Sequence, residues 1–165
     1  MRKVVFGTSV VITMILAFAI VTKVIDYSIT SRNTRLVKSI LLQTSTPMKD
    51  KTSGQVEDLI TIDYDKMFVF EPYQSMDQME KQIGFKCTKL REGLSEGIIN
   101  ILFVKDDSAV AYLFGYAEVT GYYIDIPYGE YTKARIDSMS YKVEQKEAGN
   151  SADTPKTYKY YKFEE

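Results

Sequence analysis

Residues 4–22 read VVFGTSVVITMILAFAIVT, a run of 19 residues without a charged side chain. A helix of that length rises about 28 Å, close to the ~30 Å hydrocarbon thickness of a bilayer. A core helix of a soluble domain would carry a polar stripe at the helical period, and this run has none. Residues 1–25 are therefore predicted to be an N-terminal transmembrane anchor, in contact with the membrane from Val4 to Thr22.

The flanking charges predict the direction in which the anchor crosses the membrane. Arg2 and Lys3 favour a cytoplasmic N-terminus by the positive-inside rule, so we expect the remaining chain outside the cell membrane after a single pass. Ala17-Phe18-Ala19 also fits the small-x-small pattern of signal-peptide cleavage, and release after Ala19 is the alternative. The apolar run continues past that point, which favours an uncleaved signal anchor. Both alternatives deliver the same domain to the extracytoplasmic side.

Composition restricts what that domain does. The chain has 165 residues, a formal net charge of −1, and neither histidine nor tryptophan. The residues after the anchor suffice for one domain with its own core. Without histidine there is no imidazole base and no His-ligated metal. Without a block of basic residues there is no electrostatic footprint for nucleic acid. We therefore expect no nucleic-acid partner, no cofactor and no metal site.

The single cysteine, Cys87, has no intramolecular partner for a disulfide. We expect a buried side chain, because free cysteines are often interior, and an intermolecular disulfide is the alternative. Cys87 lies too far from the apolar run to be a lipid-attachment site, which excludes a lipoprotein.

The segment 26–55 is predicted to be a helical stalk and linker. Leu36, Val37, Ile40 and Leu41 follow helical spacing on one face, so Asp26–Gln43 is expected to be a helix that either continues the anchor or packs on the domain. Pro47 and Gly54 indicate a linker up to Gln55. The extracytoplasmic domain is expected to cover residues 56–165.

A strand followed by a helix is the sharpest local pattern in the domain. Lys66–Glu71 is apolar on both faces, which predicts a short strand covered on both sides, and Pro72 ends it. Ser75 with Gln78 three residues later forms a capping-box pattern at the start of a helix. Gly84 lies where a helix-terminating glycine belongs.

The rest of the domain is rich in predicted strands. Ile98–Val104 and Ala109–Tyr116 are separated by a short polar turn, which predicts a hairpin. Ala134–Glu147 alternates between apolar and polar residues and is expected to be one half-solvated strand, with Thr157–Phe163 pairing back on it. The predicted class is α+β: a single N-terminal transmembrane helix, then a small domain with a mainly antiparallel sheet and one or two helices.

The strand–helix segment carries a resemblance. Tyr64 to Tyr73 reads YDKMFVFEPY, which resembles a W/Y-D-K-x-x-V-F-x-P-Y motif of small, uncharacterised membrane-anchored or lipoprotein-like proteins of Gram-positive bacteria. The similarity covers about Ile62 to Tyr112, and Tyr64 stands where tryptophan is expected. The resemblance implies a membrane location and this order of elements. It implies no catalytic residues.

Candidate catalytic groups have ordinary structural explanations. Asp63 and Asp65 lack further acidic residues at calcium-loop spacing, and the Asp106-Asp107 pair is common turn chemistry. Without histidine a serine nucleophile needs a lysine base, and Ser138 and Lys142 are well separated if they lie on a strand. We therefore expect that the protein is not an enzyme.

The segment from Gly115 to Tyr131 is unusually rich in tyrosine. Tyrosine is enriched at protein interfaces, because it buries a large area at a small entropic cost. The alternative is that these rings fill the core or cover a sheet edge, as they do in many β-rich domains. The candidate binding residues are Tyr116, Tyr122, Tyr123, Tyr128 and Tyr131.

Together these patterns predict a membrane-anchored, non-enzymatic protein-binding module. A regulator, inhibitor, immunity factor or accessory subunit that engages an envelope or secreted protein fits this description. The alternative is a domain that binds a small ligand or a cell-wall glycan through the same aromatic residues.

Overall fold

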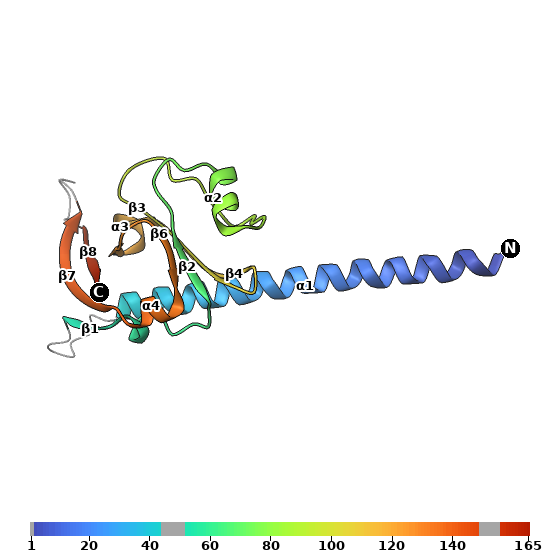
Figure 1. Cartoon of the computed structure of the whole chain (residues 1–165), viewed down its shortest axis with the longest axis horizontal. Helices are drawn as coiled ribbons and strands as arrows, with labels where there is room; N and C mark the ends of the chain where they lie inside the picture. Colours follow the sequence, from blue (N-terminus) through green and yellow to red (C-terminus); the bar gives the residue numbers. More distant parts are fainter. Residues whose placement is uncertain (1, 44–51, 149–155) are drawn as a thin grey trace.

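The computed structural model describes residues 2–43, 52–148 and 156–165. Helix α1 (Arg2–Gln43) contains 42 residues, and its N-terminal half projects away from the domain (Figure 1). From Ile12 to Ile29 its large apolar side chains are 44% to 72% exposed. Among the described residues, α1 is the one helix long and apolar enough to cross a membrane. This agrees with an anchor that presents apolar side chains on all sides to lipid.

The C-terminal half of α1 belongs to the folded domain. Val37 and Leu41 are fully buried. The hydroxyl of Thr30 donates to the Ala109 carbonyl at 2.5 Å, and the Thr34 hydroxyl accepts from the Tyr112 N–H at 3.0 Å. These contacts tie α1 to strand β4 (Ser108–Tyr116), which runs beside it (Figure 1). The predicted stalk is thus an integral part of the core.

Two side chains near the C-terminus of the chain donate hydrogen bonds to carbonyls in the last turn of α1. A helix leaves its final carbonyls without partners and favours positive charge at this end, but the last turn of α1 has no basic residue. The Lys159 ammonium donates to the carbonyls of Leu41, at 3.0 Å, and of Leu42. The Tyr161 hydroxyl also donates to the Leu41 carbonyl, at 2.7 Å. Burial lowers the pKa of Lys159, as expected for an ammonium held against the domain.

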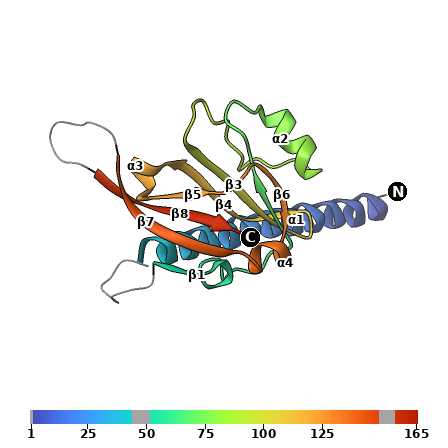
Figure 2. The ribbon, with the colours of Figure 1, turned by 60° about the vertical axis from the view of Figure 1, so that its left-hand side comes forward.

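The described residues form two four-stranded sheets. Sheet B has the order β4-β3-β2-β6 and is antiparallel throughout. Sheet A has the order β1-β7-β8-β5, and β5 pairs with β8 in parallel while the other pairs are antiparallel (Figure 2). The predicted α+β class with mainly antiparallel pairing is confirmed. The strands not yet given are β1 (Ser53–Gln55), β2 (Lys66–Val69), β3 (Ile98–Lys105), β5 (Tyr122–Asp125), β6 (Gly129–Thr132), β7 (Ser140–Ala148) and β8 (Lys156–Glu164).

Short helices fill the connections. They are the 3-10 helix η1 (Val56–Asp58), α2 (Met76–Ile83), α3 (Ala117–Thr120) and α4 (Lys133–Asp137). Part of the predicted linker, Ser53–Gln55, pairs with β7 as β1 and so lies in the domain, while Pro47 is outside the described residues.

Several local predictions agree with the structure. The capping box of α2 is present, with the Ser75 N–H donating to the Gln78 side chain at 2.9 Å, and Gly84 ends the helix at a φ of 87°. The β3–β4 hairpin turns through Asp106 and Asp107 at φ of 47° and 55°. Positive φ at both central residues is what a tight type I′ turn requires, and aspartate tolerates it well.

The prediction of a single strand over Ala134–Glu147 was wrong in its first part. Lys133–Asp137 forms α4, and Ser140 begins β7. The physical reason is a helix cap: the Thr132 hydroxyl accepts from the Arg135 N–H at 3.3 Å, while Ile136 is fully buried. The alternation of apolar and polar residues that predicted the strand corresponds to two strand faces only from residue 139 onward.

Sheet B is covered on both faces. One apolar cluster joins Val37 and Leu41 of α1 to Met67, Ile101 and Phe103. A second cluster lies against α2 on the opposite face, with side chains from Phe68, Phe70, Met79, Leu102 and Cys87. Cys87 is 5% exposed, as expected for a buried thiol.

Candidate binding groove

The five candidate tyrosines do not share one surface. Tyr122 is fully buried, and Tyr131 is 4% exposed with its hydroxyl donating to the Pro127 carbonyl at 2.7 Å. Both rings point inward because each lies on a strand whose alternate side chains face the core. Tyr122 and Tyr131 are therefore core residues in this structure and do not contribute to an exposed patch. Tyr116 is half-buried, and its hydroxyl lies 2.5 Å from the Ser95 hydroxyl.

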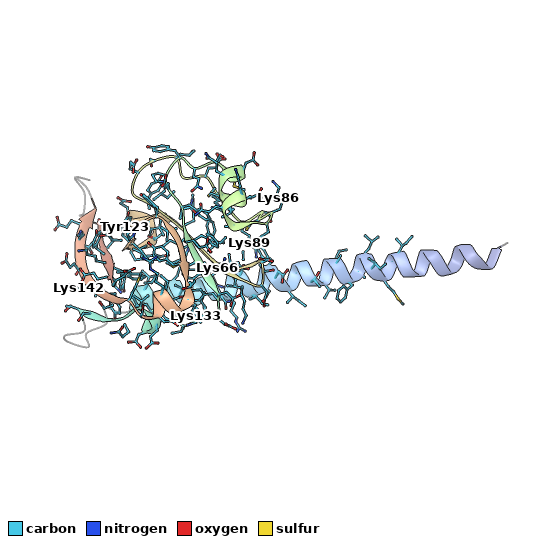
Figure 3. The ribbon with its side chains drawn as sticks, in the orientation of Figure 1. Lys66, Lys86, Lys89, Tyr123, Lys133 and Lys142 are labelled. Atoms are coloured by element: carbon cyan, nitrogen blue, oxygen red, sulfur yellow. The ribbon has the colours of Figure 1, made fainter. Side chains whose placement is uncertain are left out.

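Tyr123 and Tyr128 reach the surface. The Tyr123 ring stacks on Tyr160 with centroids 5.6 Å apart and an interplanar angle of 12°. Tyr128 is 49% exposed. In Figure 3, Tyr123 lies at the end of the domain far from the projecting half of α1, whereas Lys86 and Lys89 lie at the nearer end.

Tyr128 stands where two hollows meet. The larger, of about 650 Å³, lies between the end of β2 and α2 and includes Glu71 and Tyr73 in its lining. The smaller, of about 360 Å³, lies between β5, the end of β8 and the start of β3. Both are lined by Val69 and Tyr128. We call the two hollows together the Tyr128 groove.

Tyr73 is a second exposed aromatic residue in this groove, and the sequence reasoning did not select it. It is 63% exposed and has a φ of 64°. A positive φ is an outlier for a bulky residue and costs about 1–3 kcal/mol. The Tyr73 N–H donates to the Gly93 carbonyl at 2.7 Å, which helps to hold this conformation. Backbone outliers of this kind concentrate at functional sites, so we treat Tyr73, like Tyr128, as a candidate binding residue.

The groove also presents polar groups. Side-chain amides from Gln74, Gln78 and Gln82 line its larger hollow, and the Gln74 amide donates to the Gln82 oxygen at 2.9 Å. Such amides both donate and accept hydrogen bonds, as a peptide backbone or a sugar does.

Charged side chains of both signs line the groove, with Glu71 and Lys81 in the larger hollow and Asp125 and Lys162 in the smaller. Burial raises the pKa of Tyr128, and the charges of Glu96, Glu71 and Asp125 raise it further. Among the described side chains, no lysine or arginine lies within ion-pair distance of these three carboxylates. The Tyr160 hydroxyl donates to the Asp125 carboxylate at 2.6 Å. The groove therefore offers both acidic and basic side chains to a ligand.

The other candidate groups take part in structural contacts. Asp63 pairs with Lys105, and Asp65 accepts from the Asp106 N–H at 3.1 Å, which fixes the hairpin turn. Ser138 donates to the Arg135 carbonyl at 2.7 Å, and Lys142 pairs with Glu164 at 2.6 Å. Across the described residues, no group of three or more Cys, Asp or Glu side chains is arranged to hold a metal ion.

No protein-family model, curated protein or solved structure matches this chain. The resemblance carried by residues 62–112 therefore stays a prediction. The first and last tyrosines of this motif differ in burial. Tyr64 is buried edge-on against Phe103, with ring centroids 5.1 Å apart, while Tyr73 lies exposed in the groove.

Proposed function

We propose that this chain is a single-pass, membrane-anchored and extracytoplasmic binding module that holds an envelope or secreted protein in the Tyr128 groove without enzymatic activity. The observation that carries the proposal is the pair Tyr73 and Tyr128, 63% and 49% exposed, which line one groove. Exposed tyrosines in a concave site are frequent binding hot spots. The Gly93 contact helps to hold the backbone of Tyr73, so less backbone ordering is required when a partner binds.

The position of the groove suits an anchored protein. Helix α1 runs along β4, one outer strand of sheet B, whereas the groove lies beside the start of β6, the opposite outer strand. A partner therefore has access to the groove while α1 spans the membrane.

The continuity of α1 favours a partner close to the bilayer. Lys89 donates to the Asp26 carbonyl at 3.3 Å and to the Thr30 hydroxyl, so the domain contacts α1 just after the apolar run. Asp26 lies four residues beyond Thr22, about 6 Å along the helix. This is about the thickness of one headgroup layer, roughly 5–7 Å. We infer that the domain rests at the membrane surface, outside the cell membrane with the N-terminus in the cytoplasm.

Replacing both groove tyrosines tests the proposal. We expect Tyr73→Ser combined with Tyr128→Ser to abolish affinity capture of a stoichiometric partner from detergent-solubilised cells, since two hot-spot rings are worth about 2 kcal/mol or more each. The matched control is Val119→Ser, because Val119 is 84% exposed on α3 and outside the groove. Failure of the native protein to capture a partner, or equal capture by both variants, would argue against the proposal.

A glycan is the second candidate ligand. The amides of Gln74, Gln78 and Gln82 beside two tyrosine rings are suited to sugar hydroxyls and sugar faces. A rise in melting temperature with peptidoglycan fragments, lost in the Tyr73→Ser, Tyr128→Ser variant, would favour this candidate. The absence of any shift would remove it.

A further inference from the structure

We propose that two copies of this chain associate in the membrane through one exposed side of α1, with their helices parallel and with Ile29 and Leu36 at the contact. The inference rests on the membrane anchor of the proposed function and goes beyond the groove. Three features lead to it: an exposed apolar stripe, its distance from the lipid, and the polar residues on either side of it.

The apolar stripe consists of Ile25, Ile29 and Leu36, which are 50%, 44% and 43% exposed. They follow one another at i, i+4 and i+11, so their side chains leave the helix within about 40° of one another. We call these three residues the Ile29 stripe. The buried side of the same helix, with Val37 and Leu41, points about 120° away. The Ile29 stripe is therefore not the side of α1 that packs on the domain.

Lipid does not account for the exposure of the outer two stripe residues. Ile29 and Leu36 lie 7 and 14 residues beyond Thr22, where the apolar run ends, which is about 10 Å and 21 Å along the helix. The headgroup layer is only about 5–7 Å thick. Ile25 is therefore level with the headgroups, whereas Ile29 and Leu36 lie beyond them. Apolar side chains aligned on one side of a helix in water are typical of a contact with another protein surface.

The membrane helix makes a second copy a suitable occupant. Two copies of a single-pass protein cross one membrane in the same direction, so their α1 helices meet in parallel, related by a twofold axis along the membrane normal. Each residue of the stripe then meets the same residue of the other copy at the same height. Apolar side chains pack well against their own kind, so Ile29 and Leu36 suit this arrangement.

The two residues between Ile29 and Leu36 fit the same symmetry. Arg32 lies on one side of the stripe and Asn33 on the other. A twofold axis parallel to the helices brings Arg32 of each copy beside Asn33 of the other and keeps the two arginines apart. A guanidinium donates hydrogen bonds that an amide oxygen accepts. The sides of the stripe are therefore complementary to those of a second copy.

The contact is small and depends on the membrane. Three half-exposed apolar side chains offer much less than the roughly 800 Å² per partner of a standard stable interface. Anchoring in one membrane offsets this, because it raises the effective concentration of one copy around another. We therefore expect the pair to form in the membrane and to separate on dilution in detergent.

Single cysteines test which side of α1 faces the other copy. We introduce Ile29→Cys or Leu36→Cys in the full chain, with Ser28→Cys and Arg35→Cys as matched controls. Both control residues are exposed, and each lies one residue from its counterpart but about 100° around the helix. After oxidation of membranes from expressing cells, we expect at least fivefold more disulfide-linked dimer at 29 and 36 than at 28 and 35. The native chain, whose single cysteine is buried, should give none.

An exchange of two residues tests the twofold symmetry. Asn33→Arg in the Leu36→Cys chain places arginines of the two copies side by side, and like charges repel, so the yield of linked dimer should fall at least threefold. Adding Arg32→Asn restores an arginine–asparagine pair on each side and should return the yield to within a factor of two. A loss of folding caused by Asn33→Arg would not be rescued by this exchange.

Equal yields at all four positions, or linkage at 29 and 36 only to a different protein, would overturn the inference. So would a failure of Arg32→Asn to restore the yield. The proposed function stands after any of these results if the native protein still captures a partner through Tyr73 and Tyr128. Absence of the native chain from the membranes would instead remove the anchor on which both proposals rest.

Discussion

Leu41→Ala is expected to lower the free energy of unfolding by about 2–5 kcal/mol. Leu41 is fully buried in the apolar cluster that joins α1 to both sheets, and truncation leaves a cavity there. Its carbonyl is held by Lys159 and Tyr161, so the helix has little freedom to shift and fill the space. Urea unfolding of the full chain in detergent, followed by circular dichroism, measures the effect.

Leu36→Ala is the matched control, because it deletes the same atoms from a residue that is 43% exposed in the same helix. We expect it to cost less than about 1 kcal/mol. If the two substitutions had equal effects, the C-terminal half of α1 would be a stalk beside the domain and not part of its core.

Two arginines in the apolar half of α1 are expected to prevent insertion in the membrane. Ile12 and Ile15 lie near the middle of the apolar run and are 58% and 62% exposed. Each arginine at the centre of a membrane helix costs about 2.5–3.5 kcal/mol, and the favourable contribution of each isoleucine is lost as well. The combined Ile12→Arg, Ile15→Arg change of roughly 6–8 kcal/mol should move the protein from the carbonate-washed membrane fraction to the soluble fraction.

Leu94→Arg combined with Val119→Arg adds the same charge at positions that are 76% and 84% exposed on the domain, and should leave the protein in the membrane. Retention of the helix variant after carbonate washing would contradict the anchor. The mass of the native protein tests cleavage: an intact N-terminus is expected, whereas a chain that begins at Ile20 would indicate release.

Elements that are determined by local residues were predictable from the sequence. The α2 cap depends on Ser75 and Gln78, which are three residues apart, and the hairpin depends on a two-residue turn. Contacts between distant residues were not predictable in this way. No residue near Leu41 in the sequence indicates that Lys159 and Tyr161 donate to its carbonyl. No local pattern distinguishes a parallel β5–β8 pair from an antiparallel one.

The groove was only partly predictable. Tyr122 and Tyr123 are neighbours on a strand, and alternation alone requires that they face opposite sides, so one of them had to be internal. The sequence does not tell which. Tyr73 followed a proline at the end of a strand, which indicated a turn, but its exposed ring lies beside Tyr128 only because β6 pairs with β2.

Photo-crosslinking from the groove in intact cells tests the central proposal most directly. Tyr128→p-benzoylphenylalanine places a reactive aromatic group where the two hollows meet, and Val119→p-benzoylphenylalanine is the matched exposed control on α3. A binding module predicts one discrete adduct in the membrane fraction that appears on irradiation at position 128 and is absent at position 119. No adduct at position 128, or the same adducts at both positions, would contradict a partner held in the Tyr128 groove.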